Sequence, residues 1–428
     1  MCIYTEILND MEIKRDLYLQ KLMHSRHNGM IKIVTGMRRS GKSYLLFQLF
    51  ADALLQEGIP DDHIIKINLE DRRNSTLRNP DNLLKHIDSF ITDDYMHYIL
   101  LDEIQLVDEF EDVLNSYLSM HNADVYVTGS NAKFLSKDVI TEFRGRGQEI
   151  RIHPLSFAEY MSTKSNPNAY DMNHLFEYMQ YGGLPKVATM TDDVERVEYL
   201  KSLFLNTYIK DIKDRYAITL DDDLEELIDV IASNIGSLTN PNKIQNTFQS
   251  VKQSKISVNT IKNYLDYMQD AFMIEKAVRY DIKGRKYIST PAKYYFEDLG
   301  LRNARLNFRQ TEQTHLMENL IYNELRLRGY SVDVGQVTYY TKDDQGKSDR
   351  KVLEVDFVCN KGYERIYIQS AFALPTPEKQ DQEFKSLKNI DDSFEKIVIV
   401  AGMQPTYRNN DGILILNIYD FLLNKVKI

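Results

Sequence analysis

Short apolar runs alternate with amphipathic helical patterns over the first third of the chain. Runs of this length, separated by helical stretches, are typical of parallel strands joined by crossover helices. The pattern therefore predicts an α/β domain with a parallel sheet over residues 1–155. The expected strands cover residues 31–34, 64–69, 98–101, 125–127 and 149–152.

Residues 156–220 follow a helical pattern, broken by a Gly-Gly-Leu-Pro turn at residues 182–185, and we expect a helical connector here. Residues 221–300 begin with amphipathic helices, one of them over 257–269 with Ser257 as its N-cap. Two short alternating runs around a Lys-Gly turn follow these helices. A helix followed by such a hairpin predicts a winged-helix-like domain.

Residues 301–428 return to a mixed pattern, in which a helical stretch over 312–327 precedes strand-like runs. This order predicts a second α/β domain at the end of the chain. Its expected strands cover residues 336–340, 352–359, 365–372, 396–400 and 412–418.

Composition limits the kind of protein. The 428 residues carry 53 Lys and Arg against 63 Asp and Glu, a net charge of −10, and 43% of them are apolar. A disordered chain is thereby excluded, and a nucleic-acid contact would need a local basic patch. The sequence has two cysteines, Cys2 and Cys359, and no run of about 18 apolar residues. We expect a cytoplasmic protein without a disulfide framework or a membrane span.

One motif fits a phosphate-binding loop. Residues 36–43 lie after an expected strand and at the start of an expected helix, which is the context that this motif requires. Backbone N–H groups would wrap the phosphates, Lys42 would reach the β- and γ-phosphates, and the Ser43 hydroxyl would ligate Mg²⁺. We therefore expect ATP and Mg²⁺ as cofactors. The nucleotide-binding residues would be Gly36, Met37, Arg38, Arg39, Ser40, Gly41, Lys42, Ser43 and Tyr44.

Two further strands end in residues suited to nucleotide hydrolysis. An apolar run ends in Asp102 and Glu103, about 60 residues after the phosphate loop. Asp102 would support the Mg²⁺, and Glu103 would deprotonate the attacking water. The next expected strand leads to Ser130 and Asn131, either of which would bond the γ-phosphate or the water. A solvated polar turn is the alternative at both places.

Two arginines, Arg144 and Arg146, follow this polar segment. Guanidinium groups suit bidentate phosphate contacts, so these residues would stabilise the reacting phosphates in their own chain or act as a finger toward a neighbouring copy. Solvated loop arginines are the alternative. Sequence spacing does not decide among these roles.

Taken together, these motifs resemble a family of bacterial and archaeal AAA+ ATPases, in which a P-loop domain is followed by a domain of unknown function with a nuclease-like end. The resemblance covers nearly the whole chain, and it implies ATP binding and hydrolysis without supplying a substrate. Arg15 and Tyr18 match family positions before the first strand, where they either pack near the adenine or form a plain helix face. The motifs that carry the resemblance lie at residues 35–43, 100–105, 128–131, 144–146, 153–160, 181–185 and 295–300.

The winged-helix-like segment is locally basic. Between Lys243 and Lys286 there are nine Lys and Arg against four Asp and Glu, a local charge of +5 in an acidic chain. A basic helix and wing can contact duplex DNA. A rigid connector with solvated charges is the alternative. The candidate DNA contacts are Lys262, Lys283, Arg285 and Lys286.

The end of the chain resembles a restriction-endonuclease-like core. Such a core places an acid on a helix, an Asp on a strand and an acid-x-Lys pair on the next strand, where they hold Mg²⁺ and activate water. Glu318 and Asp356 match the first two positions, but Gln369 replaces the second strand acid and Ala371 replaces the Lys. The resemblance therefore implies an inactive nuclease-like site, kept either for binding or for structure.

The fold class expected from these patterns is an AAA+-like P-loop α/β domain, then a winged-helix-like segment, then a restriction-endonuclease-like α/β domain. We expect an ATPase whose nucleotide state moves C-terminal domains that bind duplex DNA, a protein partner or another copy of the chain. A nucleotide-gated DNA-binding or scaffold protein with little hydrolysis is the alternative, and an ATP-regulated nuclease is less favoured. The nine histidines show close spacing only at His24 and His27, so no zinc site is expected.

Overall fold

The computed structural model divides into two compact units. The first unit extends to Pro154 and includes Asp270–Phe272, and the second contains Leu155–Gln269 and Met273–Ile428. No helix among the described residues is both long enough and apolar enough to cross a bilayer. The structure describes residues 13–129, 145–218, 221–252, 254–342, 348–402, 404–426 and 428.

The first unit is built on a five-stranded sheet in the order β2-β3-β4-β1-β5, in which every neighbouring pair is parallel. All five strands expected from the sequence are present, and the α/β fold class is confirmed. Parallel strands need crossover connections, which explains why helices alternate with the strands along the chain. The strands are β1 (Ile31–Thr35), β2 (Ile64–Asn68), β3 (His97–Asp102), β4 (Ala123–Thr128) and β5 (Gly147–Arg151).

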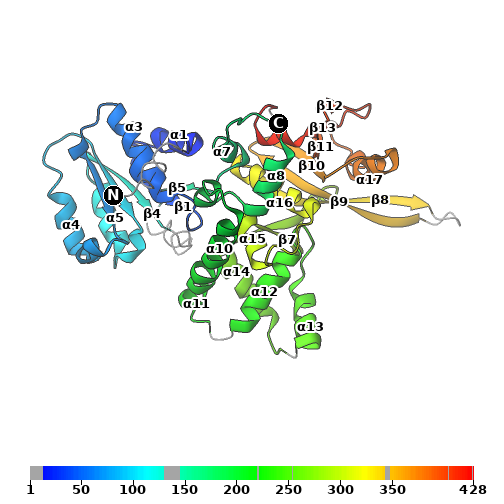
Figure 1. Ribbon diagram of the computed structural model, residues 1–428, viewed down its shortest axis with the longest axis horizontal. Helices are drawn as coiled ribbons and strands as arrows, with labels where there is room; N and C mark the ends of the chain where they lie inside the picture. Colours follow the sequence, from blue (N-terminus) through cyan, green and yellow to red (C-terminus); the bar gives the residue numbers. More distant parts are fainter. Residues whose placement is uncertain are drawn as a thin grey trace. The chain divides into compact units, whose positions relative to one another are not determined.

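Helices cover both faces of this sheet (Figure 1). A continuous helix over residues 42–56 consists of α2 (Lys42–Tyr44), the π-helical segment η3 (Leu45–Phe50) and α3 (Ala51–Gln56). It packs on one face, where the rings of Phe50 and Tyr126 lie 4.6 Å apart. The other helices are α1 (Asp16–His24), α4 (Pro80–Asp88) and α5 (Phe110–Leu118), with short 3-10 turns η4 (Asp61–His63), η5 (Arg72–Arg78) and η6 (Ile104–Leu106).

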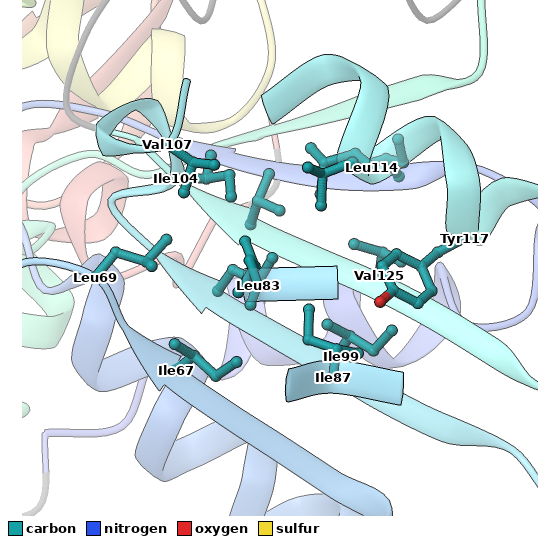
Figure 2. Close-up of a cluster of buried hydrophobic side chains, with 14 of the residues drawn as sticks. Ile67, Leu69, Leu83, Ile87, Ile99, Ile104, Val107, Leu114, Tyr117 and Val125 are labelled. Carbon is teal, nitrogen blue, oxygen red and sulfur yellow. The ribbon is translucent and has the colours of Figure 1, made fainter. Parts of the chain in front are cut away.

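The apolar core of the first unit lies between the sheet and the helices α4 and α5. Successive strand residues point to opposite faces, so alternate positions of β2, β3 and β4 face these helices. Figure 2 shows Ile67, Ile99 and Val125 from the strands packed with Leu83 of α4 and Leu114 of α5. All of these side chains are nearly or fully buried. Because the neighbouring strands are parallel, their carboxyl ends lie at the same edge of the sheet, where the phosphate loop follows β1.

The second unit begins with helices that lie within residues 156–220, where a helical connector was expected. The N-cap expected at Ser257 is confirmed, because its Oγ accepts a hydrogen bond of 3.0 Å from the backbone N–H of Thr260. The helices are α7 (Phe157–Met161), α8 (Met172–Tyr181), α9 (Pro185–Ala188), α10 (Asp193–Leu203), η8 (Phe204–Ile209), α11 (Lys210–Tyr216), α12 (Asp221–Ser233), α13 (Pro241–Lys252), α14 (Val258–Asp270) and α15 (Leu299–Arg305).

An eight-stranded mixed sheet completes the second unit, in the order β12-β13-β11-β10-β9-β8-β6-β7. The two runs expected to form a wing are the strands of the hairpin β6–β7. The expected boundary at residue 300 separates this hairpin from the C-terminal domain, but the structure joins them in one sheet. Arg279 of β6 pairs with Val334 of β8, so the hairpin belongs to the C-terminal sheet. The strands are β6 (Ile274–Asp281), β7 (Lys286–Phe296), β8 (Ser331–Lys342), β9 (Ser348–Lys361), β10 (Glu364–Ala371), β11 (Glu395–Val400), β12 (Tyr407–Arg408) and β13 (Leu414–Asn417), with helices α16 (Gln313–Leu327), α17 (Pro377–Lys388) and α18 (Ile418–Leu422).

Two motifs that carried the family resemblance meet at Asp298. One carboxylate oxygen of Asp298 accepts the backbone N–H of Gly183 at 2.8 Å, and the other accepts that of Leu301 at 2.9 Å. A Cβ on Gly300 would lie 2.0 Å from the carbonyl oxygen of Tyr181, so only glycine permits this approach. Burial raises the pKa of Asp298 to about 6, although backbone N–H groups oppose the rise.

Candidate functional site

The phosphate loop connects β1 to the helix that begins at Lys42. Gly36 has a φ of 138°, and a Cβ there would lie 2.1 Å from the carbonyl oxygen of Ile152. Gly41 has a φ of 96° and forms the N-cap of the helix. Both positions therefore require glycine. The resulting turn places the candidate residues from Gly36 to Tyr44 around the positive end of a helix, which favours anions.

Lys42 lies inside this loop. Its Nζ donates hydrogen bonds of 3.0 Å to the carbonyl oxygens of Gly36 and of Met37, and the side chain is 5% exposed. Burial lowers the pKa of Lys42 to about 8, while the carboxylates of Glu103 and Asp102 oppose this shift. A desolvated ammonium interacts strongly with a phosphate, because little water screens the charge.

Asp102 connects the phosphate loop to the strand ends. One carboxylate oxygen of Asp102 accepts a hydrogen bond of 3.0 Å from the Ser43 hydroxyl, and the same oxygen accepts the Thr128 hydroxyl. Burial raises the pKa of Asp102, although both hydrogen bonds favour its carboxylate. Hydroxyl and carboxylate oxygens are ligands that Mg²⁺ prefers, so this pair fits the cation expected from the sequence.

Glu103 follows Asp102 in a left-handed backbone conformation, with a φ of 54°. Its backbone N–H donates a hydrogen bond of 3.1 Å to the Thr128 hydroxyl, and the Gln105 amide donates to its carboxylate. Backbone strain of this kind clusters at functional sites. Two interactions therefore fix the position of the expected catalytic carboxylate.

Sequence reasoning missed the roles of Thr128 and Gln105. Thr128 appeared only as part of a motif, and its contact with Asp102 requires that β4 lie beside β3. This contact was not predicted because the local sequence pattern does not show which strands are neighbours in a sheet. Gln105 lies two residues after Glu103, so its spacing in the sequence was the available signal.

Helix α1 braces the phosphate loop through Arg15, which lies at its N-cap. The Arg15 guanidinium donates hydrogen bonds to the carbonyl oxygens of Ser40, at 3.0 Å, and of His153, at 2.7 Å. The Tyr18 hydroxyl accepts the backbone N–H of His153 at 3.1 Å. These contacts support the loop from behind, and the expected position near the adenine remains a prediction.

Of the remaining candidates for hydrolysis, the structure describes Arg146 alone. Asn131 and Arg144 lie outside the described residues. Arg146 is exposed, and its carbonyl oxygen accepts the N–H of Ile31 at 2.8 Å, at the start of β1. The phosphate loop follows the other end of β1, about 16 Å away over five residues. The structure therefore does not bring Arg146 to the phosphate loop of its own chain.

The nuclease-like candidates form a buried ionic cluster in the second unit. Glu318 of α16 and Asp356 of β9 both face Lys293 of β7, with Lys293 Nζ 2.9 Å from the Glu318 carboxylate and 4.0 Å from that of Asp356. Glu354 contributes a third carboxylate, 2.7 Å from the same Nζ. Burial opposes the charge of Lys293, but Glu318, Asp356 and Glu354 together raise its pKa. Sequence reasoning missed Lys293 and Glu354.

The amide of Gln369 does not join this cluster. Its Oε1 accepts the backbone N–H of Asp356 at 3.4 Å and the Ser386 hydroxyl at 3.3 Å. Burial and the neighbouring Glu318 raise the pKa of Asp356 well above its usual range, although Lys293 opposes the rise. Position 371 of β10, where a nuclease core would have a lysine, holds alanine. The ammonium beside Glu318 and Asp356 comes instead from Lys293 of β7.

The candidate DNA contacts are exposed, and they lie at two different places in the fold. Lys283, Arg285 and Lys286 surround the turn of the β6–β7 hairpin, whereas Lys262 lies on α14. Lys283 forms an ion pair of 3.0 Å with Asp391. The structure therefore gathers three of the four candidates at one turn, and one of the three has an acidic partner.

Comparisons with known families agree with this organisation. Residues 28–161 match an AAA domain, residues 172–312 match a domain of unknown function (DUF8612), and residues 313–421 match another (DUF4143). The parallel sheet, the phosphate loop and the buried carboxylate at a strand end, together with the AAA match, define an AAA-type P-loop domain in the first unit.

Two relatives extend over nearly the whole chain. An uncharacterised protein of Haemophilus influenzae is 35% identical over 414 residues, which cover 96% of this chain and 98% of that protein. The chain belongs to the family of this protein. An uncharacterised protein of Methanocaldococcus jannaschii is 29% identical over 414 residues, which cover 90% of this chain and 87% of that protein.

Solved structures show more distant similarity. The Aeropyrum pernix ORC1 protein in complex with DNA is 10% identical, covers 70% of this chain and 93% of its own, and has a TM-score of 0.33. Cdc6p from Pyrobaculum aerophilum is 12% identical, covers 74% and 98%, and has a TM-score of 0.31. At these TM-scores neither structure bears on the function of this chain.

Proposed function

We propose that the protein binds ATP with Mg²⁺, hydrolyses it, and uses its nucleotide state to move its C-terminal domains in the cytoplasm. The observation that carries this proposal is the direct contact of Ser43 with Asp102, beside a buried Lys42 and a fixed Glu103. A turn with a purely structural role would not need the Ser43 hydroxyl, the Asp102 carboxylate and the Lys42 ammonium to be close together. The oxygen-rich pair and the desolvated ammonium complement a cation and a phosphate respectively.

In this proposal the backbone of the loop and the Lys42 ammonium hold the β- and γ-phosphates. Ser43 and Asp102 would hold Mg²⁺, which supplies positive charge that neutralises the phosphate oxygens. Glu103 would accept a proton from water as the water oxygen attacks the γ-phosphorus and the bond to the ADP oxygen breaks. Gln105 would keep the Glu103 carboxylate in position.

Two expected roles complete the reaction scheme. Asn131 would sense the γ-phosphate or orient the attacking water. An arginine finger would come from a second copy of the chain, because Arg146 lies at the far end of β5 from the phosphate loop. Arg144 is the alternative finger. A finger supplied by a neighbour makes turnover depend on protein concentration.

The experiment is steady-state ATP turnover by the full chain, compared with Lys42→Ala and Glu103→Gln. We expect Lys42→Ala to lose nucleotide binding, and Glu103→Gln to bind ATP while turnover falls by about 100-fold or more, as for the loss of a general base. Glu109→Gln, which changes an exposed acid in the same segment, should leave turnover unchanged. Turnover by the wild type no faster than by Glu103→Gln, at every oligomeric state, would refute hydrolysis and leave binding to be tested separately.

A second candidate function is a nucleotide-gated DNA-binding protein or scaffold that hydrolyses ATP slowly. The exposed cluster of Lys283, Arg285 and Lys286 favours this candidate, because clustered cations attract phosphates in an otherwise acidic chain. Tight ATP binding without turnover, together with ATP-dependent binding of duplex DNA, would support it over the ATPase.

A further inference from the structure

Two histidines and an aspartate gather at the end of the parallel sheet opposite to the phosphate loop. His63 ends η4 directly before β2, His97 is the first residue of β3, and Asp93 precedes that strand. One potential ligand atom from each residue lies within 4.8 Å of the other two. This is the kind of spacing that a single metal ion bridges.

Strand register brings the two histidines together. Ile64 of β2 pairs with Tyr98 of β3 in a parallel register, so the preceding residues, His63 and His97, are neighbours. Their rings stack with centroids 4.4 Å apart. His63 Nε2 lies 3.3 Å from a carboxylate oxygen of Asp93.

The hydrogen bonding of His97 leaves one ring nitrogen available to a metal. His97 Nδ1 lies 2.8 Å from the carbonyl oxygen of Tyr95, and because a carbonyl only accepts, Nδ1 must carry the hydrogen. In the neutral ring, Nε2 then offers a lone pair. This atom is buried and has no hydrogen-bond partner among the described residues. Metal-ligating histidines characteristically donate their other N–H to a carbonyl or a carboxylate in this way.

The segment that carries Asp93 is held in place by its own hydrogen bonds. One carboxylate oxygen of Asp93 accepts the backbone N–H of Tyr95 at 2.9 Å, while the other lies beside His63. The Asn122 amide donates a hydrogen bond of 2.9 Å to the Asp93 carbonyl oxygen. Asp93 is 40% exposed, His63 is 12% exposed and His97 is fully buried, so the cluster is open to solvent on the Asp93 side.

We propose that His63, Asp93 and His97 bind a divalent transition metal ion, with Zn²⁺ as the expected ion. Two imidazole nitrogens and one carboxylate form a donor set that suits Zn²⁺, whereas Mg²⁺ prefers the all-oxygen pair of Ser43 and Asp102 at the other end of the sheet. Three protein ligands leave a fourth position for water. The bound ion ties η4 to the segment before β3 and stabilises the first unit.

This site does not depend on the proposed ATPase activity. Sequence reasoning missed it, because His63 and His97 are 34 residues apart, and Asp93 and His97 alone supply only two ligands. Only the parallel pairing of β2 with β3 places them together. Loss of ATP turnover would leave the metal site intact, and loss of the metal site would leave the phosphate loop unchanged.

The test is a titration of the full-length protein with Co²⁺, a spectroscopic substitute for Zn²⁺, in excess Mg²⁺ to occupy oxygen sites. We expect one equivalent to bind with visible absorption bands typical of a tetrahedral site, and Zn²⁺ to displace it. His63→Gln and Asp93→Asn change residues that solvent reaches, and each should weaken binding by at least about 100-fold, since even outer ligand partners contribute 10- to 100-fold. His24→Gln, which changes an exposed histidine of α1, is the matched control and should bind as the wild type does.

Thermal unfolding supplies a second readout. Zn²⁺ should raise the melting temperature of the wild type and of His24→Gln, and should not raise that of His63→Gln or Asp93→Asn. Circular dichroism establishes that each variant is folded before titration. Absence of stoichiometric binding by the wild type would overturn the proposal. Identical spectra and affinities for the wild type, His63→Gln and Asp93→Asn would also overturn it.

Discussion

The phosphate loop contains a buried ammonium group, that of Lys42. The Lys42 ammonium donates hydrogen bonds to two carbonyl oxygens of this loop. The carboxylates of Glu103 and Asp102 partly offset the free-energy cost of burying its charge. The side chain therefore lies near the balance between its charged and neutral forms at mildly alkaline pH. A bound phosphate would shift this balance toward the charged form.

This balance predicts that ATP affinity falls at alkaline pH. Burial lowers the pKa of Lys42 to about 8, so above that pH the unliganded protein must take up a proton to bind ATP as an ammonium–phosphate pair. The apparent affinity should fall by up to about tenfold per pH unit above pH 8. Calorimetric titration with ATP between about pH 6.5 and pH 9.5 measures this slope.

Lys42→Arg is the matched control, because a guanidinium stays charged over this range. Its affinity for ATP is expected to be weaker than that of the wild type but flat above pH 8. An equal decline in both proteins would show that another group titrates.

At the scale of elements, one carboxylate joins the end of α8 to the start of α15. Both oxygens of Asp298 accept backbone N–H groups, one from Gly183 after α8 and one from Leu301 within α15. The side chain is 2% exposed. Two segments separated by more than one hundred residues are thereby fixed against each other within the second unit.

Asp298→Asn should destabilise the second unit by about 1–3 kcal/mol. The amide group has only one acceptor oxygen, so its N–H would face a backbone N–H and leave a buried donor unsatisfied. Urea denaturation at neutral pH measures the change in the free energy of unfolding. Asp192→Asn is the control, because Asp192 is an exposed N-cap of α10 and asparagine is an equally good cap. Equal effects of the two substitutions would refute the junction role.

Over the full chain, charge is distributed unevenly. The chain has a net charge of −10, yet residues 243–286 carry +5. The cations at the β6–β7 turn are exposed, and Lys283 is paired with Asp391. A DNA phosphate that contacts Lys283 would compete with this ion pair. An acidic chain with such a patch is expected to bind DNA only with strong salt dependence.

We predict that changing Lys283, Arg285 and Lys286 together to Glu weakens duplex DNA binding and lowers the salt slope by about 3, one for each phosphate contact. Fluorescence anisotropy at several salt concentrations measures both quantities. DNA should also stimulate ATP turnover by the wild type and not by the triple variant.

A charge-matched control uses three exposed lysines elsewhere, Lys66, Lys85 and Lys186, changed together to Glu. This control should keep the salt slope of the wild type. If both triple variants lose the same affinity, general charge and not the turn governs binding. An unchanged slope in the turn variant would exclude the turn as the DNA contact and favour a protein partner.

The sequence alone determined the features whose information is local. Residues 36–43 specify the phosphate loop because a strand, a glycine turn and a helix follow one another without interruption. The five strands of the first sheet were also predictable, because short runs rich in apolar residues alternate there with helical patterns. Asp102 and Glu103 were found because they directly follow such a run.

Contacts between residues far apart in the sequence depend on the tertiary structure. The strand order placed Thr128 against Asp102 and joined β6 to β8. It also brought Lys293 of β7 to Glu318, although position 371, where the sequence comparison expected a lysine, holds alanine. It also paired His63 with His97. Local periodicity sets which face of a strand is buried, but not which strand becomes its neighbour. That choice depends on the packing of whole elements, so contacts across the sheets could not be read from spacing along the chain.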